Sequence, residues 1–126
     1  MPDERSRNEG SIAEATRRHH YRVACDIQVR GRCEPGGRPF EGRLVNIGLG
    51  GANLELGFPV KVPATLHIEI PLHAEGHREE TLVLPGTVVW NVADGGGAPY
   101  PVGVQFLELD DETRRALYAF VGDLLT

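Results

Sequence analysis

The chain has 126 residues, which is enough for one domain with a single hydrophobic core and not comfortably for two. Its net charge of −5 argues against non-specific binding to nucleic acid, because such binding needs a basic face. No apolar run approaches the roughly 20 residues of a membrane span and no signal-peptide core precedes the domain, so we expect a cytoplasmic protein without a membrane span.

The N-terminal part of the chain is polar, and the first regular pattern follows it. Residues 1–16 carry few apolar side chains and are expected to form a flexible arm, with the folded domain over 17–126. From Arg22 onward, apolar residues alternate with polar ones. The apolar positions of this stretch are Val23, Cys25, Ile27 and Val29. A period of two predicts a half-buried strand, and Pro-Gly-Gly at 35–37 predicts the turn that ends it.

The middle of the chain repeats the strand pattern. Further strands are predicted at about 39–45, 52–56, 65–70, 81–92 and 102–107. A polar loop is expected over 71–80, and Asp-Gly-Gly-Gly at 94–97 predicts a flexible turn. Three aromatic side chains are predicted to lie in the core, namely Phe40, Trp90 and Phe106.

The last part of the chain changes to a helical period. Asp110 or Asp111 can cap the start of a helix. The apolar positions that follow form one helical stripe at Leu117, Phe120, Val121 and Leu124. Short strands followed by one helix predict an all-β domain, a six-stranded antiparallel β-barrel with a C-terminal α-helix packed on one opening.

Two motifs carry candidate chemistry. Arg17, Arg18 and Arg22 stand just before the first predicted strand, and a later turn at 46–51 reads Asn-Ile-Gly-Leu-Gly-Gly. Arginine holds phosphate through a planar two-pronged fork, and a glycine-rich turn lets a ligand approach the backbone closely. Together they suit a small, doubly phosphorylated guanine ligand. Taken singly, each also has a plainer interpretation, a solvated charge run or a strand-connecting turn.

These motifs, together with the GVQFLEL strand at 103–109 that leads into an acidic helix start, resemble the PilZ domain family. The resemblance covers residues 17 to about 125 and implies a split β-barrel that binds cyclic di-GMP (c-di-GMP), a bacterial second messenger. It implies that the arginines grip phosphates and stack on guanine, that Asn46 reads a guanine edge, and that Gly51 allows close backbone approach. It also implies a receptor that regulates a partner protein in motility, exopolysaccharide production or surface behaviour.

The second motif departs from the family at one position, where the family normally carries serine and this chain has Gly48. The ligand site that the resemblance implies comprises Arg17, Arg18, Arg22, Asn46, Gly48 and Gly51. The lost hydroxyl is expected to weaken binding about 2- to 12-fold, the equivalent of one neutral hydrogen bond. If the rest of the pocket is intact, Gly48→Ser should raise the affinity. The departure also supports an alternative, a degenerate PilZ adaptor that does not bind c-di-GMP and acts through protein contacts.

Other classes of function find little support in the sequence. No nucleophile elbow or P-loop is present, so we expect neither an enzyme nor a cofactor. Cys25 and Cys33 lack the spacing of a metal knuckle and are expected to be reduced thiols. Three histidines, His67, His73 and His77, are spread over a strand and a loop and are expected to be exposed rather than to bind a metal. We expect a monomer or weak dimer with an unidentified effector protein and no DNA or RNA partner.

Overall fold

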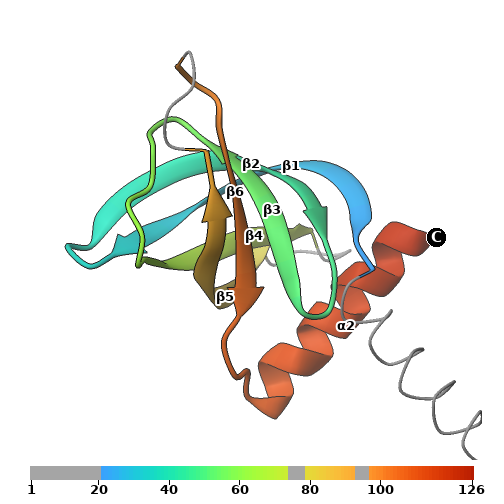
Figure 1. Ribbon diagram of the computed structural model, residues 1–126. Coiled ribbons are helices and arrows are strands. Elements are labelled where there is room, and N and C mark those ends of the chain that lie inside the picture. The colour runs from blue at the N-terminus through green and yellow to red at the C-terminus, as the bar shows by residue number, and fades with distance from the viewer. Residues whose placement is uncertain (1–20, 74–78, 93–96) are drawn as a thin grey trace, which may run out of the picture.

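The computed structural model describes residues 21–73, 79–92 and 97–126 of the chain. Its elements are, in chain order, β1 (Val23–Glu34), β2 (Arg38–Ile47), β3 (Gly51–Leu56), β4 (Thr65–His73), β5 (Glu79–Asn91), β6 (Tyr100–Phe106) and α2 (Asp111–Leu125). Each predicted strand and the predicted C-terminal helix is therefore present (Figure 1). The arm predicted at 1–16 and most of the turn predicted at 94–97 lie outside the described residues.

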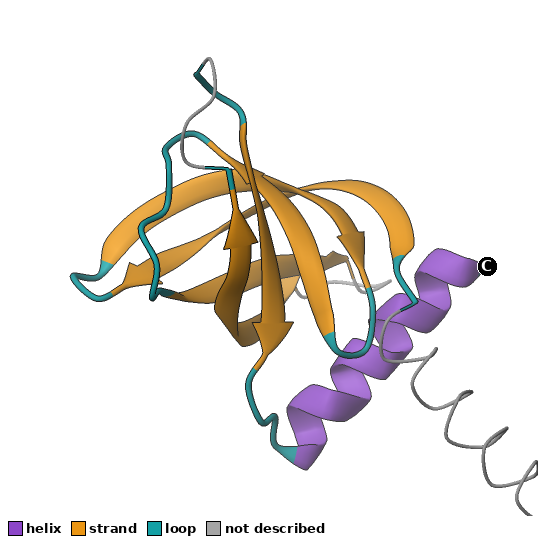
Figure 2. Ribbon diagram, in the orientation of Figure 1, coloured by secondary structure: helices purple, strands orange, loops and turns teal. Residues whose placement is uncertain are grey.

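The strands close into a barrel. Their order around it is β1-β2-β3-β6-β5-β4, and β4 pairs back with β1. Every neighbouring pair is antiparallel. A closed barrel leaves no strand edge unpaired, which removes a route to aggregation. The prediction of a six-stranded antiparallel barrel with a C-terminal helix is confirmed (Figure 2).

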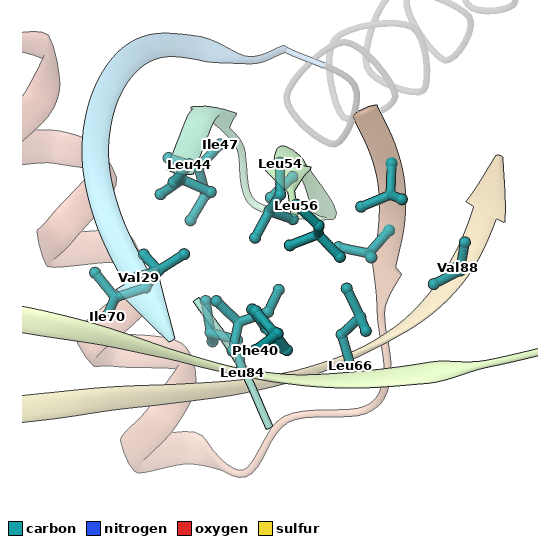
Figure 3. Close-up of a cluster of buried hydrophobic side chains, with 14 of the residues drawn as sticks. Val29, Phe40, Leu44, Ile47, Leu54, Leu56, Leu66, Ile70, Leu84 and Val88 are labelled. Carbon is teal, nitrogen blue, oxygen red and sulfur yellow. The ribbon is translucent and has the colours of Figure 1, made fainter. Parts of the chain in front are cut away.

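The barrel interior is filled by the inward face of each strand. In β3, Ala52, Leu54 and Leu56 are fully buried, and the residues between them are only half-buried. This alternation follows from the pleat of a strand, which sends successive side chains to opposite faces. Residues from several strands meet inside, as Figure 3 shows for Leu44, Leu66, Leu84 and Val88, among others. Phe40 lies in this core, and Phe106 packs partly buried against it, as predicted.

Helix α2 packs against one end of the barrel (Figure 2). Its N-cap is Asp110, whose side chain accepts a hydrogen bond of 2.7 Å from the backbone N–H of Thr113. This contact satisfies one of the N–H groups that a helix start leaves unpaired. Leu117 and Val121 are buried, and Phe120 and Leu124 are partly buried, so the predicted apolar stripe is the packing face.

The predicted polar loop at 71–80 is too long. Strand β4 continues to His73 and β5 begins at Glu79, and the two strands stay paired up to these ends. Leu72 explains the extension, because it packs partly buried against the core cluster. Polar residues are compatible with the solvent-facing side of a strand, so their abundance here does not mark a loop.

The prediction that Trp90 lies in the core is wrong, because 44 % of its surface is exposed. The pairing of β5 with β6 shifts between Val88 and Trp90, which marks a β-bulge at this point. One extra residue in a strand reverses which face the following side chains occupy. Val88 therefore points into the barrel, whereas Trp90 lies on the outside.

Candidate ligand-binding site

The turn between β2 and β3 carries the second motif and is held by backbone hydrogen bonds. The N–H of Gly48 donates to the carbonyl of Gly51 over 2.9 Å, which closes the turn. The N–H of Phe106 donates to the carbonyl of Gly50, also over 2.9 Å, and ties the turn to the end of β6. The turn is therefore fixed both within itself and to a neighbouring strand.

The chain segment that enters β1 passes directly over this turn. Val23 pairs with Ile47, so Tyr21 and Arg22 continue beyond the end of β2 and reach the turn. A Cβ atom placed on Gly48 would overlap the carbonyl oxygen of Tyr21. The backbone of Tyr21 therefore occupies the space in which a side chain at position 48 would begin.

Arg22 lies against two of the three glycines of the motif, Gly48 and Gly51. Its Nη1 atom is 3.2 Å from the position that a Cβ atom of Gly48 would take, and its Nη2 atom is 3.0 Å from that of Gly51. Burial lowers the pKa of Arg22 from its ordinary value, yet an arginine remains charged at neutral pH. The structure thus brings Arg22, Gly48 and Gly51 close together. Arg17 and Arg18 lie outside the described residues, and their part in the site stays a prediction.

Asn46 lies next to this site on the outer face of β2. It pairs with Asn53 on the neighbouring strand β3, and the Asn53 side-chain Nδ2 donates a 2.9 Å hydrogen bond to its Oδ1. This bond uses an acceptor of Asn46 and leaves the N–H groups of its side chain to donate elsewhere.

Sequence reasoning missed Trp90 as a candidate site residue. Asn46 pairs with Asn53, Asn53 pairs with Gly103, and Gly103 pairs with Trp90, so the four residues form one row across β2, β3, β6 and β5. A Cβ atom on Gly103 would overlap the indole of Trp90, which shows that the ring lies against the strand backbone. The glycine between two valines in β6 was the available signal, because a glycine within a strand often marks a close approach.

Metal and thiol chemistry find no support in the described part of the chain. Within residues 21–73, 79–92 and 97–126, no group of three or more His, Cys, Asp or Glu side chains lies close enough together to hold a metal ion. Cys25 and Cys33 are free thiols. Burial raises the pKa of both, so neither is activated as a thiolate. No helix within the described ranges has the length and apolar character needed to cross a membrane.

The comparisons with known proteins identify the family. A sequence model of the PilZ domain matches residues 16–123, and the chain therefore belongs to the PilZ domain family. No curated protein matches the chain.

Several solved PilZ structures share the fold. The PilZ domain of CeSA from a cellulose-synthesizing bacterium is 18 % identical, with a TM-score of 0.64 over 84 % of this chain and 99 % of that chain. The PilZ domain of Escherichia coli YcgR with c-di-GMP is 15 % identical, with a TM-score of 0.60 over 82 % and 88 %. The Bacillus subtilis inhibitor of motility MotI is 18 % identical, with a TM-score of 0.59 over 79 % and 46 %, so this chain spans about half of it. At these identities the likeness concerns the fold.

Proposed function

We propose that this protein is a c-di-GMP receptor whose ligand lies on the outer barrel surface beside the β2–β3 turn. The observation that carries the proposal is the juxtaposition of Arg22 with the motif glycines, next to a row of residues that contains Asn46 and Trp90. A cation, amide donors and an aromatic ring are the groups that a phosphorylated guanine ligand needs. The solved YcgR PilZ domain, which is similar in fold, contains c-di-GMP.

The arginines would bind the phosphates. Each charge-assisted hydrogen bond between arginine and phosphate can contribute roughly 1.5–3 kcal/mol, more than a neutral hydrogen bond. Arg22 would supply such bonds from its place at the turn, and Arg17 and Arg18 would add to them. Fixing Arg17 and Arg18 on the ligand would also fix the segment that carries them, and this change is the signal that a partner protein would read.

Asn46 and Trp90 would recognise the base. Because Asn53 occupies the Oδ1 acceptor of Asn46, the amide presents N–H donors, and these match the O6 and N7 acceptors on one edge of guanine. Trp90 offers an exposed ring for stacking, which tolerates any base but adds affinity. The amide would therefore supply selectivity for guanine, and the indole would supply a flat surface on which a base can stack.

Calorimetry with c-di-GMP tests the proposal. The wild-type protein should bind, and Arg18→Ala and Arg22→Ala should each abolish the heat or weaken binding strongly. Arg115→Ala is the matched control, because Arg115 is an exposed arginine on α2 and belongs to neither motif. Absence of heat from the wild-type protein at high micromolar concentration would contradict the proposal.

A second candidate function is an adaptor that acts through protein contacts without c-di-GMP. It is favoured by a groove of about 780 Å³ between α2 and the barrel. Partly buried apolar side chains line both walls, with Ile27 on the barrel and Phe120 on the helix among them. Carboxylates also line the groove, at Asp26, Glu80 and Asp123. Such a groove suits a partner segment with apolar anchors and basic neighbours.

Variants separate the two functions. An adaptor should retain its partner in pull-downs without c-di-GMP and in the Arg22→Ala variant, and should lose it in Phe120→Ala. A receptor should instead show partner binding that changes when c-di-GMP is added and that no longer responds in Arg22→Ala.

A further inference from the structure

Gly48 is buried beneath the chain's own backbone rather than facing an open pocket. The atom that a Cβ at this position would overlap is the carbonyl oxygen of Tyr21, and the carbonyl carbon of Tyr21 is also close, at 3.2 Å. A backbone group cannot rotate away as a side chain can, so the segment itself would have to move. Both Tyr21 atoms that lie near this position belong to its backbone, and the residue is otherwise largely exposed.

We propose that Gly48 is a positioning residue: it seats the carbonyl of Tyr21 and thereby holds the Arg22 guanidinium at the turn, ready for an anionic ligand. The ligand part of this inference rests on the proposed function. On this view, ligand affinity in this chain requires that position 48 carry no side chain. The glycine is then an adaptation to the path of the segment before β1 and not a lost contact.

The geometry of neighbouring residues supports this role. Tyr21 immediately precedes Arg22, and the pairing of Val23 with Ile47 fixes the strand that follows. Arg22 is thus held on both sides along the chain. Its guanidinium contacts two positions that carry no side chain, and at Gly51 a Cβ atom would also overlap the carbonyl oxygen of Val104. Both positions need glycine because a backbone carbonyl approaches each of them closely. The Arg22 guanidinium packs against the surface that the two glycines form.

A pre-positioned arginine strengthens binding because it loses less freedom when the ligand arrives. Immobilising a long side chain such as arginine weakens an interaction by an amount that corresponds to about 10- to 30-fold in affinity. Displacing Tyr21 from Gly48 would release Arg22 and forfeit this advantage. Gly48→Ser should therefore lower the affinity, although it adds the hydroxyl that the family motif normally carries.

The main test measures c-di-GMP affinity by calorimetry in Gly48→Ala and Gly48→Ser. We expect both variants to bind at least about 10-fold more weakly than the wild type. Gly57→Ala is the matched control, because a Cβ atom there meets nothing within 4 Å, and its affinity should equal that of the wild type. A Gly48→Ser variant that binds as tightly as the wild type, or more tightly, overturns the inference.

A double-mutant cycle distinguishes positioning from general damage. If Gly48 acts through Arg22, the double variant Gly48→Ala with Arg22→Ala should bind no more weakly than Arg22→Ala alone, measured with weak-binding titrations at high ligand concentration. Losses that simply add would show that Gly48 acts independently of Arg22, and they would overturn the inference.

The reactivity of Arg22 in the absence of ligand tests the positioning by Gly48 independently of c-di-GMP binding. Phenylglyoxal modifies accessible arginines, and peptide mass spectrometry gives the rate at each site. In the wild type, Arg22 should react more slowly than Arg115, and Gly48→Ala should accelerate Arg22 and leave Arg115 unchanged. If the wild type binds no c-di-GMP but Arg22 shows this protection, the proposed receptor function fails and the positioning stands. Equal rates for Arg22 and Arg115 in the wild type overturn the positioning, and this comparison needs no variant.

Discussion

The indole of Trp90 lies so close to the backbone of Gly103 that a Cβ atom on residue 103 would overlap the ring. The bulge in β5 brings Trp90 to the outer face. Because Gly103 in β6 has no side chain, the ring can pack against the backbone there. Asn53 is the next residue in the same row, followed by Asn46. An exposed aromatic ring is therefore held at a fixed place in the row that also contains the candidate guanine-reading amide, with Gly103 and Asn53 between the two.

The fluorescence of Trp90 should report ligand binding. The chain contains a single tryptophan, so its emission reports this position alone. We expect c-di-GMP to change the emission as a base stacks on the indole, along the same binding curve as calorimetry. Trp90→Ala should weaken binding by roughly 1–3 kcal/mol, about 5- to 150-fold, and Trp90→Phe, which keeps a ring, by less. Binding measured by calorimetry without a change in emission would place the ligand away from Trp90.

Gly103→Ala should displace the indole without altering its chemistry. The added methyl group must push Trp90 from the strand backbone, because it would otherwise overlap the indole Nε1 atom. We expect a shifted emission maximum in the ligand-free variant and an affinity for c-di-GMP that approaches that of Trp90→Ala. Gly57→Ala serves as the control with open space around the new methyl group. An unchanged emission spectrum in Gly103→Ala would mean that the ring does not rest on residue 103 in solution.

The two asparagines should contribute unequally to affinity. Asn46→Ala removes the proposed donor to guanine and should weaken binding about 2- to 12-fold, the effect of one neutral hydrogen bond. Asn53→Ala leaves the donor in place but removes the 2.9 Å bond that orients it, so a smaller loss is expected. Calorimetry on both variants measures the difference. A larger loss in Asn53→Ala than in Asn46→Ala would show that Asn53, rather than Asn46, contacts the ligand.

Most of the architecture follows from local patterns in the sequence. The alternation of apolar residues predicts the strands, because one face of each strand lies in the apolar barrel interior and the other faces solvent. In β3 the inward residues are Ala52, Leu54 and Leu56. The face of Trp90 could not be predicted, because one inserted residue reverses every side chain beyond it and leaves no local mark. The sequence shows that position 48 lacks the family's hydroxyl but not what surrounds it, because the carbonyl of Tyr21 comes from a distant part of the sequence and approaches Gly48 only in the folded chain.

Acid should weaken the start of helix α2 through Asp110. Hydrogen bonds from Thr113 hold the pKa of the Asp110 carboxyl below its ordinary value. A lowered pKa in the folded protein means that the stabilisation is complete above the unfolded pKa of about 4 and is lost as the pH falls through the folded pKa. Thermal unfolding of the wild type and of Asp110→Asn, which keeps a capping oxygen without the charge, should therefore converge below about pH 4. A difference that stays constant through this range would contradict the assignment to Asp110.

Helix α2 should depend on Leu117 for its attachment to the barrel. Leu117 is fully buried, whereas its neighbour Tyr118 is half exposed on the same helix turn. Leu117→Ala removes buried surface and leaves a cavity, which should lower the free energy of unfolding by about 2–5 kcal/mol. Tyr118→Ala removes a larger side chain from an exposed position and should cost well under half as much, because little buried surface is lost. Urea unfolding followed by circular dichroism measures both variants. Equal losses would mean that α2 does not pack through its Leu117 face, since only that face distinguishes the two neighbours.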